Sequence, residues 1–93
     1  MSDLAARLRL VVEANHGSVI SDHGNIWRVE VPADVAPGLA GVLAGFRAQF
    51  VGQTTRDAPR RVTNWQTGEV IVCHGDNVTT AYLAYEVDLA PLV

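Results

Sequence analysis

Residues 78–89, VTTAYLAYEVDL, alternate apolar and polar side chains with the two-residue period of a β-strand. One face of this strand carries Ala81, Leu83, Tyr85, Val87 and Leu89, while the opposite face is mostly polar. A strand of this kind covers a core on one side only, which is typical of antiparallel sheets. We therefore expect the chain to build an antiparallel sheet around this segment.

Four further runs predict the other strands of that sheet. Residues 17–21 and 25–32 flank the turn DHGN and predict a hairpin whose second strand ends at Pro32, because proline cannot donate to a strand ladder. Residues 60–65 and 69–74 predict two more strands, bounded by the turns QTG and GDN. The run VIVC is apolar on both faces, which favours a central strand or a strand at an interface. Residues 51–59 are interpreted as an exposed connection.

Two segments have the apolar spacing of helices. Leu4, Leu8, Val11 and Val12 predict a first helix that starts near Ser2 or Asp3 and ends before Gly17. The second helix is predicted from Ala36 to Gly52, and its apolar stripe is Leu39, Val42, Leu43, Phe46 and Phe50. The expected fold is α+β in the order α-β-β-α-β-β-β, with both helices packed on one face of the sheet. Residues 1–93 then form a single small domain.

A second side of the predicted second helix carries almost no side chains, because Gly38, Gly41 and Gly45 lie there with Ala48. Each glycine inside a helix costs up to about 1 kcal/mol relative to alanine. Three interpretations remain open: packing of this face on the sheet or first helix, close approach of a subunit or partner, and no role. Small residues four apart, such as Gly41 and Gly45, let another backbone approach closely.

The composition limits the classes of function. The chain has 93 residues of which 48% are hydrophobic, so its core is thin and some apolar surface is expected to be covered by self-association or by a partner. Scattered surface Ala and Val are the alternative explanation. With Cys73 as the single cysteine, no secretion signal and no membrane span, we expect a cytoplasmic protein without cofactors. The absence of lysine suggests a high-GC bacterial or phage source.

Positive charge gathers in the middle of the chain at Arg47, Arg56, Arg60 and Arg61, and the last third is acidic. These two groups of charges are expected to pair or to be solvated. The alternative is a loop around residues 56–61 that binds phosphate, an acidic partner or nucleic acid. Trp65 and Tyr82 are the surface candidates for an aromatic platform, whereas Trp27 and Tyr85 are expected in the core. The net charge of −3 argues against general nucleic-acid binding.

The two predicted turns SDHGN and CHGDN resemble each other and offer His23, His74 and Asp76 as candidate ligands for a metal or members of a catalytic pair. This alternative requires both turns to lie at one end of the sheet. Aspartate, asparagine and glycine are also the residues that tight turns need, so turn chemistry explains the same pattern.

Residues 4–50 resemble in layout the small docking domains of the TubC type found at the N-termini of nonribosomal peptide synthetases. The segments LAARLR, GSVISDHGNIWRVEVP and LAGVLAGFRAQF have the order of that family's helix, hairpin and second helix. The resemblance implies a module that grips a short motif at a partner's terminus. The basic residues usual in the family's second helix are reduced to Arg47, and the segment from Arg60 onward has no counterpart.

Taken together, these patterns favour a non-enzymatic protein-protein interaction module, an adaptor or inhibitor with a regulatory role that forms a homodimer. The expected contact surfaces are the glycine side of the second helix and the edge of the final sheet. The alternatives are a small enzyme or ligand-binding protein that uses the turn residues, and a nucleic-acid contact through residues 56–61.

Overall fold

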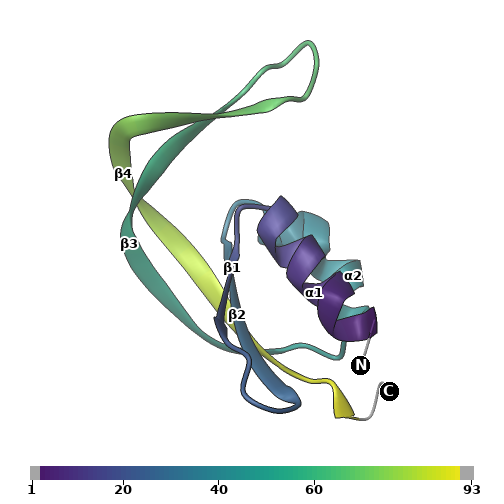
Figure 1. Ribbon diagram of the computed structural model, residues 1–93. Coiled ribbons are helices and arrows are strands. Elements are labelled where there is room, and N and C mark those ends of the chain that lie inside the picture. Colours follow the sequence, from purple (N-terminus) through teal and green to yellow (C-terminus); the bar gives the residue numbers. More distant parts are fainter. Residues whose placement is uncertain (1–2, 91–93) are drawn as a thin grey trace.

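A computed structural model describes residues 3–90 of the chain (Figure 1). In chain order the elements are α1 (Asp3–Ala14), β1 (Ser18–Ser21), β2 (Ile26–Pro32), the 3-10 helix η1 (Ala36–Leu39), α2 (Ala40–Gly45), β3 (Gln49–Thr63) and β4 (Val70–Asp88). The strands form one four-stranded antiparallel sheet in the order β1-β2-β4-β3, and both helices pack on one face of it. The α+β class is confirmed, but the predicted fifth strand is wrong.

Strand β4 is continuous where the sequence predicts two strands separated by the turn GDN. At this point the structure has a bulge: Gly75 adopts a left-handed φ of 86°, and the pairing register shifts between Pro59 and Arg60 on the opposite strand. A bulge absorbs such residues and bends a strand without ending it. The turn prediction fails because the long pairing with β3 continues on both sides of the bulge.

Strand β3 includes residues 51–59, which the sequence predicts to be a connection. Most of their side chains are exposed, as expected, but their backbone pairs with β4 from Gln49 to Thr63. Residues 51–59 carry polar side chains on both faces of the strand, which is a composition typical of loops. The backbone hydrogen bonds of a two-stranded ribbon require no apolar face, so composition alone does not reveal the strand.

The outer parts of β3 and β4 form an arm, which we define as residues 55–81. Strand β2 pairs with β4 only from Tyr82 to Asp88, so the rest of β4 pairs with β3 alone. Figure 1 shows the arm leaving the body of the protein and bending along β4 before it reaches its turn. The VIVC run therefore lies in a two-stranded ribbon and not at the centre of a covered sheet, and Val70 and Ile71 are exposed.

Helix α1 includes Asp3 and ends before Gly17 as predicted, in a Schellman motif; Ser2, the alternative start, lies outside the described residues. His16 adopts a left-handed φ of 65°, and the N–H groups of His16 and Gly17 donate to the carbonyls of Glu13 and Val12. Gly17 directly follows the left-handed residue, where its backbone passes so close to Glu30 that a Cβ atom would collide with the Glu30 carbonyl oxygen. Glycine at this position lets the first helix approach the sheet.

Helix α2 is much shorter than the predicted helix. A left-handed Arg47, φ 56°, ends it in a second Schellman motif, in which Arg47 and Ala48 donate to the carbonyls of Ala44 and Leu43. Phe50 consequently lies in β3 with an exposed side chain instead of on the helix stripe. The high glycine content weakens helix propagation, which agrees with an early end. Neither helix within residues 3–90 combines the length and apolar character of a membrane span.

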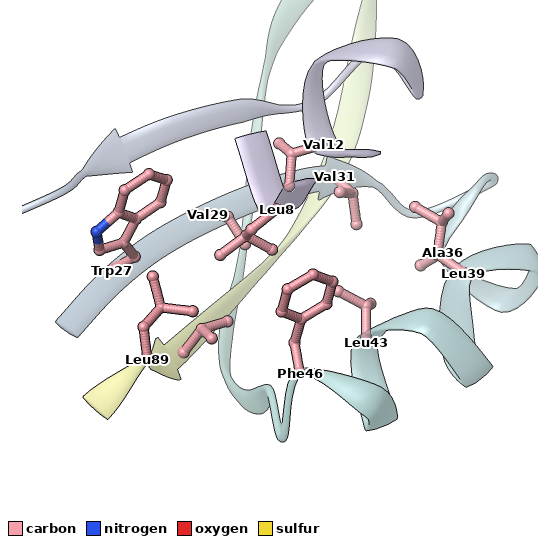
Figure 2. Close-up of a cluster of buried hydrophobic side chains, with 11 residues drawn as sticks. Leu8, Val12, Trp27, Val29, Val31, Ala36, Leu39, Leu43, Phe46 and Leu89 are labelled. Atoms are coloured by element: carbon pink, nitrogen blue, oxygen red, sulfur yellow. The ribbon is translucent and has the colours of Figure 1, made fainter. Parts of the chain in front are cut away.

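The core lies between the helices and one face of the sheet (Figure 2). Figure 2 shows side chains from α1, the segment 36–46 and strands β2 and β4 converging. The buried cluster consists of Leu8, Val12, Trp27, Val29, Val31, Ala36, Leu39, Leu43, Phe46, Val87 and Leu89. The predicted core role of Trp27 is confirmed, and Tyr85 packs beside the cluster. The core ends where β2 ends, so the arm carries no share of it.

Candidate functional site

The glycine side of the second helical segment is open. Gly38, Gly41 and Gly45 are exposed, and a Cβ atom added at any of them would meet no atom within 4 Å. Packing of these glycines on the sheet or on α1, one of the three interpretations of the sequence, is therefore wrong. Two interpretations of the glycines remain open: contact with a partner, and no role.

An apolar groove runs between the two helices next to this open side. It has a volume of about 430 Å³ and is lined by Leu4, Arg7, Leu10, Val11, Val42, Gly45 and Phe46. Leu10 is 69% exposed although leucine is among the residues most often buried in proteins. Leu10 lies outside the apolar stripe from which α1 is predicted. A leucine on the polar side of a helix is the feature of the sequence that could have indicated the groove. The groove itself depends on how α2 lies beside α1.

Arg7 is the one charged residue of the groove wall. It lies three residues after Leu4 and three before Leu10, so all three side chains share one side of α1. Among residues 3–90, no carboxylate forms an ion pair with Arg7, whereas Arg9 pairs with both Glu13 and Asp22. The groove thus combines an apolar wall with a cation that has no carboxylate partner in the described part of the chain.

Arg47 lies elsewhere, at the left-handed end of α2. It lines a separate depression of about 350 Å³ together with Ile26, Gln49, Glu86 and Asp88. The structure therefore places Arg47 near two carboxylates of β4 and away from the other arginines of the predicted basic loop.

Arg60 and Arg61 belong to the arm and are paired with carboxylates. Arg60 Nε lies 3.0 Å from Asp76 Oδ2 across the bulge, and Arg61 Nη2 donates to Asp34 Oδ1 at 2.7 Å. The second pair ties the outer arm to the loop that follows β2. Both guanidinium groups already have anionic partners. The Arg60–Asp76 pair joins the basic middle to the acidic last third as expected, whereas Arg61 pairs with Asp34, outside both groups.

Arg56 and Tyr82 form a cluster with Glu30 near the base of the arm. Arg56 Nη1 donates to Glu30 Oε1, and the guanidinium carbon lies 4.0 Å from the centre of the Tyr82 ring. Glu30 and Tyr82 are each 7% exposed. Tyr82 is therefore buried, and its predicted exposure on an aromatic platform is wrong because the Arg56 side chain lies over its ring.

Replacing Arg56 with glutamine is expected to lower the free energy of unfolding by about 1–3 kcal/mol, because a buried Glu30 carboxylate would lose its charged donor. The matched control is Arg60→Gln, whose ion pair is exposed on both sides and is worth less than about 1 kcal/mol. Urea denaturation followed by circular dichroism measures both. Equal losses in the two variants would contradict the structural role given to the Arg56 cluster.

Trp65 lies in the turn at the tip of the arm and is 94% exposed, which confirms its prediction as a surface residue. The neighbouring side chains of Val62, Val70 and Ile71 are also exposed, and Val62 pairs with Ile71 across the arm. Sequence reasoning selected Trp65 alone. The register of β3 and β4 places Val62 and Ile71 opposite each other on one face of the arm near its turn, whereas Val70 points to the other face.

The residues His23, His74 and Asp76 do not come together. His23 belongs to the turn between β1 and β2, which Figure 1 places at the opposite end of the molecule from the bend of the arm, where His74 and Asp76 lie. Among residues 3–90, no three His, Cys, Asp or Glu side chains form a group suited to a metal ion. The convergence that the metal or catalytic alternative requires is absent from this part of the chain.

The fold and these surfaces define a small α+β protein with an open apolar groove and an arm that carries an exposed tryptophan at its tip. Comparison with known proteins gives no match to the chain, whether with protein-family profiles, with curated proteins or with solved structures. The likeness of residues 4–50 to TubC-type docking domains is thus one of layout.

Proposed function

We propose that the chain is a small protein-protein interaction module without catalytic activity, which works in the cytoplasm as an adaptor or inhibitor and associates with a second copy of itself. The observation that carries this proposal is the groove between α1 and α2, where Leu10 is 69% exposed beside a glycine side that no other part of residues 3–90 covers.

Several properties of the groove support binding to a protein. Its walls are mostly aliphatic and aromatic, and contiguous exposed apolar surface of this kind marks interaction sites in proteins. The open glycines allow a partner's backbone to approach α2 closely. The unpaired Arg7 provides one directional contact for an acidic group, and arginine is enriched in interfaces.

Replacing Leu10 with glutamine is expected to weaken self-association at least tenfold. Burying a leucine side chain contributes about 1.5–3 kcal/mol, and a two-fold symmetric dimer loses this contribution twice. Glutamine keeps the length of the side chain and a good helix propensity, so α1 is retained. Sedimentation equilibrium at several protein concentrations measures the dissociation constant.

Ile20→Gln is the matched control, since Ile20 is exposed in β1 and lies outside the groove. Its dissociation constant is expected to equal that of the wild type. A wild-type chain that stays monomeric at millimolar concentration would contradict self-association, and an equal loss in both variants would contradict the assignment of the groove.

A further inference from the structure

We propose that the groove between α1 and α2 is occupied by the arm tip of a second copy of this chain, with Trp65 in the groove and Glu69 paired with Arg7. This inference rests on the proposed self-association and names the surfaces that form it.

The arm tip has the properties of an anchor. Trp65 is 94% exposed, so nothing in its own chain shields the indole ring. The turn that carries it is ordered by hydrogen bonds: Asn64 N–H donates to the Glu69 carbonyl at 2.8 Å, Gly68 N–H donates to the Asn64 carbonyl at 2.7 Å, and Gln66 N–H donates to Asn64 Oδ1 at 2.9 Å. A rigid tryptophan loses little conformational freedom on binding, and tryptophan is strongly enriched among the residues that dominate binding energy.

The groove and the tip match in chemistry. The groove is apolar except for Arg7. The tip presents the exposed Trp65, and next to the turn the arm carries Val62 and Ile71 as an exposed cross-strand pair. The tip also carries one carboxylate, Glu69, which closes the turn next to Trp65. Within residues 3–90 neither Arg7 nor Glu69 has an ion-pair partner, whereas Arg56, Arg60 and Arg61 of the arm each have one. Each surface therefore supplies the charge that the other one lacks.

The arrangement of the tip and the groove favours a closed pair of chains. Each copy has one tip at the end of an arm that projects from the body and one groove on the body (Figure 1). Two copies related by a two-fold axis satisfy both surfaces twice, with no unsatisfied tip or groove left to propagate a filament. Two tryptophans bury on the order of 300–500 Å² together, so the groove walls and the side chains around each tip supply the rest of the roughly 1,200–2,000 Å² of a stable interface.

The first experiment compares self-association of the wild type with Trp65→Ser and with Gln66→Ala, a control in the same turn whose side chain makes no hydrogen bond among residues 3–90. Sedimentation equilibrium is expected to show a dissociation constant raised at least about thirtyfold by Trp65→Ser and unchanged by Gln66→Ala. Because Trp65 is fully outside the core, circular dichroism of the variant is expected to match the wild type. An unchanged dissociation constant in Trp65→Ser would overturn the inference.

The second experiment tests whether the tip meets the groove or another tip. Arg7→Glu and Glu69→Arg each place like charges in the proposed contact, and each is expected to weaken association about tenfold. The double variant restores the pair with the charges exchanged and is expected to recover affinity to within about threefold of the wild type. No recovery in the double variant would overturn the docking of the tip in the groove.

These outcomes separate the inference from the function on which it rests. A monomeric wild type overturns both. A dimer that Leu10→Gln weakens while Trp65→Ser does not overturns the role of the tip and leaves the groove as the self-association surface. A dimer weakened by both substitutions, with recovery in the charge-exchanged variant, confirms the inference.

Discussion

Replacing Leu8 with alanine is expected to lower the free energy of unfolding by about 2–5 kcal/mol. Leu8 is fully buried, and it packs with Val12, Val29 and Phe46 in the core between α1 and the sheet. The substitution removes the apolar contacts of the side chain and leaves a cavity that close-packed neighbours fill only in part. Small domains have about 5–15 kcal/mol of total stability, so this loss is a large share of it.

Chemical denaturation followed by the fluorescence of buried Trp27 measures this loss directly, because Trp27 belongs to the same core. Leu10→Ala is the matched control: it is the same substitution in the same helix, two residues later and on an exposed side chain. We expect it to change stability by no more than about 0.5 kcal/mol. If both variants lost equal stability, the assignment of Leu8 to the core and of Leu10 to the surface would be wrong.

Replacing Gly17 with alanine is expected to lower the free energy of unfolding by about 3 kcal/mol, the upper end of the usual cost of overpacking. The new methyl group would collide with the Glu30 carbonyl oxygen and would lie 3.0 Å from both the Val12 side chain and the Val12 carbonyl oxygen. Because two of these three contacts are with backbone carbonyl oxygens, the collision can be removed only if α1 moves away from the sheet. The same denaturation measurement applies.

Gly41→Ala provides the matched control and is expected to change the free energy of unfolding in the opposite direction. A Cβ atom at residue 41 meets nothing within 4 Å and the residue lies inside α2, so alanine should raise stability by up to about 1 kcal/mol. The measurement belongs at protein concentrations where the chain is monomeric, so that effects on association are excluded. A stabilising Gly17→Ala would refute the close packing of the first helix on β2.

Much of the N-terminal half could be predicted from the sequence. The period of Leu4, Leu8 and Val12 marks α1, and the turn DHGN between alternating runs marks the first hairpin. The face of β4 that covers the core follows from its alternation, and Val87 and Leu89 are buried as expected. These features are local, because helix and strand periods are properties of consecutive residues.

The sites show the same division between local and long-range information. Trp65 is exposed as expected, but it lies in the turn after β3 and not at the end of the predicted strand 60–65. Arg60 pairs with the acidic last third as expected, whereas Arg61 pairs with Asp34. No local pattern indicates that Arg56 covers Tyr82, because these residues are distant in the chain and meet only across paired strands. The sequence also singled out the glycines of the second helix as a possible contact surface, but it did not reveal the groove beside them.

Thus the sequence by itself determined the α+β class, the first helix, the first hairpin and the core face of β4, since each depends on short-range periodicity. The tertiary structure alone decided that β3 and β4 run unbroken through residues with turn and loop composition, because pairing between two distant segments outweighs their local preferences. It also decided that Leu10 would face an open groove and that Val62 and Ile71 would lie opposite each other near the tip of the arm, since both depend on how separate elements are placed against one another.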